Sequence, residues 1–186
     1  SASALLAGSG SRGLGRRTLP MTRHAGEQRT ILPEPAAENR YLADHVDLLR
    51  RSLRRWTGRD LVERAQTPTE AARMIWEAPF VVLSHGPEPD PILSYGNRAA
   101  LALFELSWLE LTRLPSRLTA EVPDREERAR LLSQVGDRGY IDDYAGVRIS
   151  RGGRRFRIEA ATVWNLIEPD GLVVGQAATF ATWRPL

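Results

Sequence analysis

The sequence contains no cysteine and no lysine, and these two absences remove several kinds of chemistry. Without cysteine the chain has no disulfide, no thiolate nucleophile, no cysteine-ligated zinc, no iron–sulfur cluster and no cysteinyl adduct with a flavin. Without lysine it has no Schiff-base residue, no pyridoxal-phosphate lysine and no P-loop lysine. The lack of cysteine also fits a reducing compartment.

Long apolar runs are missing as well. No stretch approaches the roughly 18 residues of a membrane span, so we expect no membrane partner and a cytoplasmic location. All 26 basic residues are arginine, and the formal net charge is +3. Arginine suits contact with phosphate or nucleic acid, but a coding bias produces the same composition. Acidic residues are interspersed with the arginines, which favours the coding bias and argues against a nucleic-acid partner.

Residues 1–38 are expected to form a flexible arm, rich in Ser, Gly, Ala, Arg and Pro. The arm contains "GSGSRG" at residues 8–13, which matches the dinucleotide-binding pattern G-x-G-x-x-G. No credible strand precedes this match and no helical pattern follows it, so we reject it. Two other interpretations of the arm stay open. Its composition resembles an organelle transit peptide, which would imply import, and Met21 allows an extension ahead of a true start.

Residues 39–78 are predicted to form an N-terminal helical extension. A first helix, over 39–56 and ending near Gly58, carries apolar residues at steps of four and three. They form one stripe: Leu42, Val46, Leu49, Leu53 and Trp56. We expect this stripe to pack on the outer face of a sheet or on its copy in a second subunit, and a homodimer is our hypothesis. A second helix, over 67–79, has Thr67 as its N-cap and stops at Pro79.

Residues 79–186 are predicted to form a mostly β domain. Two strands, "FVVLSHG" and "ILSYGN", precede three helical segments, and three strands follow. Asn97 is expected to cap the helix after the second strand, and Ser107 the next one. Turns are expected at Gly152-Gly153 and at "PDG", residues 169–171. This order predicts an α+β fold with a five-stranded antiparallel sheet and short helices on one face.

Strict alternation along the late strands predicts their faces. In "YIDDYAGVRIS" it places Ile141, Val147 and Ile149 on one face, and it separates Asp142 from Asp143, which therefore cannot act as a pair. In the next strand it predicts a single apolar face: Phe156, Ile158, Ala160, Thr162, Trp164 and Leu166.

The order of elements resembles the PAS fold, and several motifs narrow the resemblance further. They are "LLRRSLRRWTGRDL", "APFVVLSHG", "DPILSYGNRAAL", "LPSRLTAE", "REERARLL", "GYIDDYAGVRIS" and "VWNL" followed by "GQAATF". Together, over residues 41–183, they are similar to the MEKHLA family, a PAS-related domain found in plant homeodomain–leucine zipper proteins and as small stand-alone proteins. The resemblance implies a sensory or regulatory role. It implies no DNA binding, because the motifs include neither homeodomain nor zipper.

Few residues invite a catalytic interpretation. His85 ends a strand without an identifiable serine or aspartate partner, so we interpret it as a turn or capping residue. His24 and His45 are too scattered to form a metal site with it. Without a plausible triad, we expect no catalysis. An enzyme using the pocket between sheet and helices, and an arginine-dependent nucleic-acid regulator, are the alternatives.

We instead expect a small apolar ligand in a cavity between the inner sheet and the helices after Asn97. Gln176 supplies a polar group in an otherwise small, apolar strand. Arg117 is expected to pair with Asp90 or with a bound carboxylate. The expected ligand-binding residues are Asn97, Leu101, Phe104, Arg117, Trp164, Asn165 and Gln176. The cofactor is left open, with non-covalent flavin allowed, and a fully packed core is the alternative.

Overall fold

An antiparallel sheet organises residues 29–186, which the computed structural model describes, apart from the side chains of residues 122–124. The strands follow the order β2-β1-β5-β4-β3, and β6 pairs with β4. Their bounds are β1 Val81–His85, β2 Leu93–Gly96, β3 Tyr140–Ile149, β4 Arg155–Ile167, β5 Val173–Phe180 and β6 Thr182–Pro185. The predicted α+β fold is confirmed. The expected last strand is divided at Ala181, which makes β6 a sixth strand.

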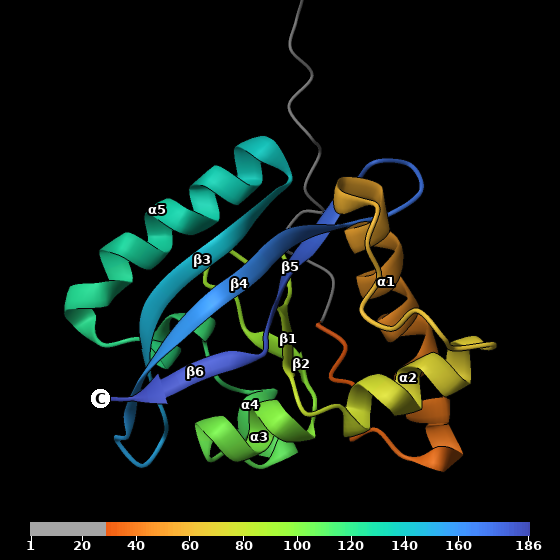
Figure 1. Ribbon diagram of the computed structural model, residues 1–186, viewed down its shortest axis with the longest axis horizontal. Coiled ribbons are helices and arrows are strands. Elements are labelled where there is room, and N and C mark those ends of the chain that lie inside the picture. The colour runs from red at the N-terminus through yellow and green to blue at the C-terminus, as the bar shows by residue number, and fades with distance from the viewer. Residues whose placement is uncertain (1–28) are drawn as a thin grey trace, which may run out of the picture.

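Helices cover both faces of this sheet. In Figure 1, α1 and α2 lie to the right of the sheet, α5 to its left, and α3 and α4 below it. We call the face that α1 and α2 cover the outer face, and the face that α3 and α5 cover the inner face. The bounds are η1 Ala37–Leu42, α1 Ala43–Thr57, α2 Pro68–Glu77, α3 Arg98–Phe104, α4 Trp108–Leu111, η2 Ser116–Thr119 and α5 Val122–Arg138.

The predicted caps account for several element boundaries. The Asn97 side-chain oxygen accepts the backbone N–H of Ala100 at 3.1 Å, as expected for the N-cap of α3. The hydroxyl of Thr67 accepts the N–H of Glu70 at the start of α2. Ser107 and Glu110 form a reciprocal capping box on α4. Gly58, at a left-handed φ of 72°, ends α1.

Two bulges overturn the predicted faces of the late strands. Asp143 in β3 and Ala160 in β4 adopt left-handed φ angles of 56° and 51°, and the β3–β4 register shifts beside both. Each extra residue reverses the alternation that follows it. Phe156 and Ile158 therefore lie on the inner face, whereas Trp164 lies on the outer face with Ala177 as its partner in β5. The single apolar face predicted for β4 was wrong.

The same reversal divides the apolar residues of β3. Ile141 lies opposite Val163 and packs in the inner-face cluster formed with α5. Val147 lies opposite Arg157, past the bulge, and belongs to the other face. The prediction that Ile141, Val147 and Ile149 share a face was therefore also wrong.

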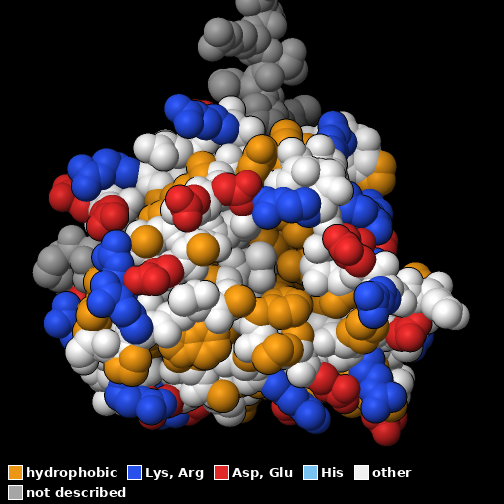
Figure 2. Space-filling model, viewed as in Figure 1, with side chains coloured by type: hydrophobic (Ala, Val, Ile, Leu, Met, Phe, Trp, Pro, Cys, Tyr) orange, Lys and Arg blue, Asp and Glu red, His pale blue; other side chains and the backbone are white. Residues whose placement is uncertain are grey.

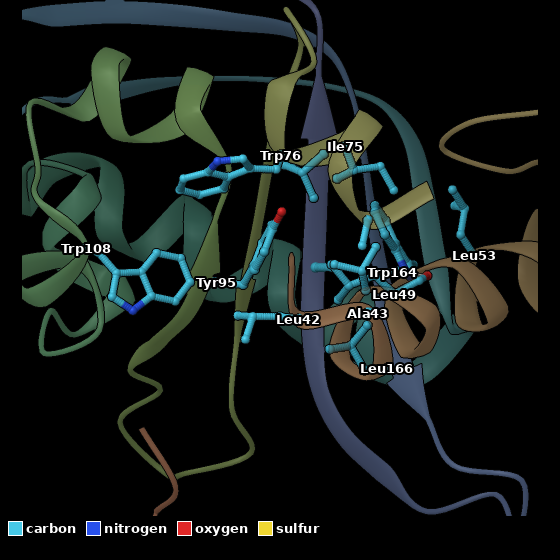
Figure 3. Close-up of a cluster of buried hydrophobic side chains, with 14 residues drawn as sticks. Leu42, Ala43, Leu49, Leu53, Ile75, Trp76, Tyr95, Trp108, Trp164 and Leu166 are labelled. Carbon is cyan, nitrogen blue, oxygen red and sulfur yellow. Dashed lines mark hydrogen bonds between the residues drawn. The ribbon is translucent and has the colours of Figure 1, made fainter. Parts of the chain in front are cut away.

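The outer face carries the largest core cluster (Figure 3). Trp164 is fully buried there and donates its indole N–H to the carbonyl of Leu49 in α1 at 3.1 Å. Tyr95 of β2 packs edge-on against Trp108 of α4, and Trp76 of α2 packs edge-on against the same Trp108. The helices before β1 thus share one core with the sheet.

The apolar stripe predicted for the first helix packs in this core. Leu42, Val46, Leu49 and Leu53 are all buried against the chain's own sheet and α2. Of the two packing modes predicted for the stripe, the structure has the one on the outer face. A homodimer stays a prediction, and it would have to use other residues. None of the helices in residues 29–186 is long and apolar enough to cross a membrane.

Candidate functional site

A cavity of about 70 Å³ lies between the inner face of the sheet and α5. A single buried water needs roughly 10–15 Å³ of such space, so the cavity has room for several waters or a small organic molecule. It is much smaller than the roughly 300 Å³ or more of sites for drug-sized ligands. Most of its wall is apolar: Leu83, Leu93, Phe104, Leu131, Leu132, Ile158, Ala161, Val163, Ala178 and Phe180.

His85, at the end of β1, contributes the first polar group of the cavity wall. Its Nδ1 lies 2.8 Å from the carbonyl oxygen of Gly86. A carbonyl only accepts, so Nδ1 must carry a hydrogen and donate it. Burial lowers the pKa of His85, which keeps the ring neutral near pH 7. The neutral ring then has an acceptor at Nε2, which is buried and has no hydrogen-bond partner among the described residues.

Gln176 of β5 lies directly opposite His85 in the β1–β5 pairing. Its Nε2 donates to the carbonyl of Leu132 in α5 at 3.3 Å and to Oδ1 of Asn165 at 3.0 Å. Both partners are acceptors, since Asn165 donates its own amide hydrogen to the carbonyl of Val135. This chain fixes the orientation of the Gln176 amide and leaves Oε1 as a buried acceptor with no partner in residues 29–186.

The two unpartnered acceptors, Nε2 of His85 and Oε1 of Gln176, cannot satisfy one another. Gln176 raises the pKa of His85, because its side chain can accept a hydrogen bond from the protonated ring. In the neutral ring Nε2 has no hydrogen, and neither Nε2 nor Oε1 has a partner among the described residues. Two acceptors cannot bond to one another without a hydrogen between them. A buried acceptor without a donor costs free energy. The cavity therefore offers a place for an N–H or O–H donor between β1 and β5.

Two arginines complete the wall of the cavity. Arg128 of α5 and Arg148 of β3 are 9% and 8% exposed. Arg128 donates to the hydroxyl of Ser116 at 2.7 Å. Arg148 donates to the carbonyl of Val147 and to the hydroxyl of Tyr144. No carboxylate in the described part of the chain forms an ion pair with either arginine. Burial and the neighbouring charge of Arg148 lower the pKa of Arg128 to about 10.

The structure brings only two of the seven expected ligand-binding residues to the cavity, Phe104 and Gln176. Trp164 lies on the opposite face of the sheet, because the bulge at Ala160 reverses β4. Leu101 packs between the two larger core clusters. The cavity that we expected beside the helices after Asn97 lies instead beneath α5.

The other three expected residues have structural partners. Asn97 accepts from Val82 and Ala100 and donates to the carbonyls of Ile75 and Phe80, so its amide is fully used. Asn165 contacts the cavity only through Gln176. Arg117 pairs with Asp90 at 3.1 Å on the surface, which is the first of the two partners expected for it.

Catalytic and metal sites find little support in residues 29–186. No group of three or more His, Cys, Asp or Glu side chains could hold a metal ion in this part of the chain. A serine–histidine contact that the sequence does not reveal joins Ser84 to Nε2 of His45 at 3.0 Å. Burial lowers the pKa of His45 to about 4. The hydroxyl of Ser84 also lies 2.8 Å from that of Ser94, and the residue is 2% exposed, so we interpret the contact as structural.

Most surface arginines are balanced by neighbouring acids. Arg50 and Arg54 share Asp60, and Arg184 pairs with Glu159. On the face that Figure 2 shows, blue and red side chains alternate around hydrophobic ones. The arginines thus form no continuous basic surface on this face, as a nucleic-acid site would need.

Solved structures with a similar fold include a PAS domain and a light-oxygen-voltage receptor. A PAS domain from Colwellia psychrerythraea matches with a TM-score of 0.52 and 15% identity, over 62% of this chain and 92% of that one. An RNA-binding light-oxygen-voltage receptor matches with a TM-score of 0.54 and 19% identity, over 64% of this chain and 34% of that one. At such identities the likeness concerns the fold alone.

Curated relatives are plant homeobox-leucine zipper proteins. The homeobox-leucine zipper protein HOX10 of Oryza sativa subsp. indica is 23% identical over 60% of this chain and 13% of its own length. HOX32 of Oryza sativa subsp. japonica is 22% identical over 87% of this chain and 19% of its own length. ATHB-14 of Arabidopsis thaliana is 28% identical over 50% and 11%. The chain therefore corresponds to a small part of each relative. The family model for the MEKHLA domain matches residues 43–185, and the chain belongs to the MEKHLA domain family.

Proposed function

We propose that this MEKHLA domain is a ligand-responsive regulatory module without catalytic activity. A small molecule binds in the cavity between the inner sheet face and α5. The observation that carries the proposal is the pair of buried acceptors on that wall, Nε2 of His85 and Oε1 of Gln176. Buried polar groups are normally hydrogen-bonded, and clusters of exceptions concentrate where ligands bind.

The cavity is suited to report its occupancy through α5. Arg128, Leu131 and Leu132 of this helix form one side of the cavity, and the strands form the other. The core beneath α5 is small, with Leu131, Val135 and Val163 as its buried members. A helix held by few buried contacts opens more readily than one held by many. A ligand that bridges the strands and α5 would therefore tighten the helix on the sheet.

The size of the cavity limits what this module senses. A flavin ring does not fit in about 70 Å³, so the flavin allowed by the sequence is not part of the proposal. The described residues of the cavity wall fit a role without catalysis. His85 forms no hydrogen bond to a hydroxyl or carboxylate there, and the hydroxyl of Ser84 is already bonded to His45 and Ser94.

A cavity-filling pair of variants tests the proposal. Ala178→Leu fills the inner-face cavity, whereas Ala181→Leu makes the same change at an exposed position between β5 and β6. Small-molecule binding is measured by thermal shift and by mass spectrometry of the native protein. We expect wild type and Ala181→Leu to bind the same compound, and binding to protect the α5 amides of both from hydrogen exchange. Ala178→Leu should show neither binding nor protection. Equal binding by both variants would place the ligand elsewhere and refute the proposal.

A further inference from the structure

The two arginines of the cavity wall carry a positive charge into a largely apolar space. A guanidinium group has several N–H donors in a planar fork. Arg128 has one hydrogen bond and Arg148 has two, and none of the three reaches a charged acceptor. The third buried arginine of the described residues, Arg50, is by contrast paired with Asp60 at 2.9 Å. Burying a cation without an anion is unfavourable.

The two arginines also line the same cavity, one from α5 and the other from β3. The charge of Arg148 acts on Arg128, and the Arg148 guanidinium stacks 5.5 Å from the ring centre of Tyr144. Gly146, between them in β3, provides the space for this arrangement, since a Cβ there would lie 3.1 Å from Nη1 of Arg148 and closer still to the hydroxyl of Tyr144. Like charges held together in a buried site are stabilised by an anion between them.

The acids nearest to these groups lie outside the cavity wall. Asp90, which raises the pKa of Arg128, is bonded to Arg117 on the surface. Glu88, which raises the pKa of His85, lies 3.8 Å from Arg29, and its buried Oε2 has no hydrogen-bond partner among the described residues.

We infer that the cavity binds a small organic carboxylate that also carries a hydroxyl group. Arg128 and Arg148 bind the carboxylate, and the hydroxyl donates to Nε2 of His85 or Oε1 of Gln176. The short carbon skeleton lies against Leu131, Ile158 and Phe180. This inference rests on the proposed function and adds the chemistry of the ligand to it. The cavity volume of about 70 Å³ limits the ligand to a few heavy atoms.

The choice of a hydroxy acid over other anions follows from the acceptor pair. Phosphate keeps an O–H at neutral pH but has no apolar part to contact the rest of the wall. Acetate satisfies the guanidinium groups but brings no donor for His85 and Gln176 at neutral pH, whereas a neutral alcohol brings the donor but no charge. A hydroxy acid supplies both at once. It also matches the apolar remainder of the wall, where a fully hydrated inorganic anion would lose its water without replacement.

The test compares lactate, propionate, 1-propanol and phosphate at equal ionic strength on the purified chain. We expect lactate to raise Tm and to shift the NMR signals of the His85 ring and the Gln176 amide. Propionate should bind more weakly, and 1-propanol and phosphate should bind weakest. Arg128→Gln should weaken lactate binding by about 10- to 100-fold, the range for a lost hydrogen bond to a charged group. Arg130→Gln, at an exposed position of the same helix, is the matched control.

The Tm of the unliganded protein distinguishes a ligand-binding role of Arg128 from a purely structural one. Removing one of two buried like charges should leave the Tm of unliganded Arg128→Gln unchanged or higher, whereas a purely structural arginine would give a lower Tm. Arg148→Gln repeats the test if Arg128→Gln fails to fold. Equal lactate affinity in wild type and both arginine variants overturns the anion assignment. If 1-propanol binds wild type but not Ala178→Leu while lactate binds neither, the ligand cavity stands and the carboxylate inference falls.

Discussion

The two faces of the sheet use their polar groups differently. On the outer face, buried donors and acceptors are matched across elements: the Trp164 indole meets Leu49, His45 meets Ser84, and the hydroxyl of Ser52 accepts the N–H of Ile167. On the inner face, His85 and Gln176 end in unpartnered acceptors beside a cavity. The outer face thus has the matched polar groups of a packed core, and the inner face has the unmatched acceptors on which the proposed ligand site depends.

The difference extends to the hydrophobic packing. The outer cluster joins α1, α2 and four strands through fully buried residues such as Leu49 and Ile75. The α5 side of the inner face has a cluster of only Leu131, Val135 and Val163. The packing beneath α5 is therefore much less extensive than the packing beneath α1 and α2, an arrangement that lets α5 open without unfolding the rest of the domain.

The largest expected effect is on the outer face. Trp164→Ala removes a fully buried indole and its hydrogen bond to Leu49, and should lower the free energy of unfolding by about 3–5 kcal/mol in denaturant melts. Trp183→Ala in β6 removes the same side chain from a half-buried position and is the control, with a loss of less than about 2 kcal/mol expected. Similar losses for the two variants would contradict the large contribution that we expect from the core beneath α1.

Much of this architecture is readable in the sequence. The caps at Thr67, Asn97 and Ser107 use side chains whose preference for helix starts is local, so their positions were predicted correctly. The stripe of α1 was also found, because helical periodicity depends only on spacing.

The bulges could not be found in the same way. Asp143 and Ala160 hold left-handed φ angles that alanine in particular rarely adopts, so no glycine marked them. A single missed bulge moved Trp164 to the wrong face and with it much of the expected site. Arg128 and Arg148 were missed for a second reason: on a surface helix and a half-buried strand they read as solvated charges, and only the packing of α5 on β3 buries them. A histidine and a glutamine paired across β1 and β5 likewise need the register to be known.

The second largest effect is expected in an acid titration of stability, which tests the burial of His45 on the outer face. His45 is neutral beneath α1, with a pKa lowered by burial to about 4 from the model-peptide value of 6.5. As pH falls through 6.5, His45 binds a proton in the unfolded chain but stays neutral in the folded chain. The free energy of unfolding therefore decreases as pH falls, until about pH 4. The expected loss from this group is roughly 2–3 kcal/mol, allowing for partial exposure of the ring.

His45→Gln should flatten that part of the stability curve, because glutamine does not titrate. His85→Gln is the matched variant on the inner face, where burial lowers the pKa in the same direction and a smaller change is expected. Chemical denaturation of both variants at intervals between pH 7 and pH 4 gives the comparison. An unchanged slope in His45→Gln would mean that carboxylates such as Asp60, whose pKa is lowered beside Arg50, dominate the acid response.

The smallest effect concerns the one exception on the outer face. Tyr95 is fully buried and its hydroxyl has no partner among the described residues, and burial raises its pKa. Tyr95→Phe keeps the edge-on contact with Trp108 and removes an unpaired polar group, so it should raise the free energy of unfolding by about 1 kcal/mol. Tyr140→Phe, at a half-buried position of β3, is the control and should change stability by less than about 0.5 kcal/mol. Thermal and urea melts are sensitive enough to separate the two. A gain confined to Tyr95→Phe would make the outer face a wholly matched core and sharpen its contrast with the inner face. A loss would mean that the hydroxyl has a partner, such as a buried water, and that the two faces differ less than their side chains indicate.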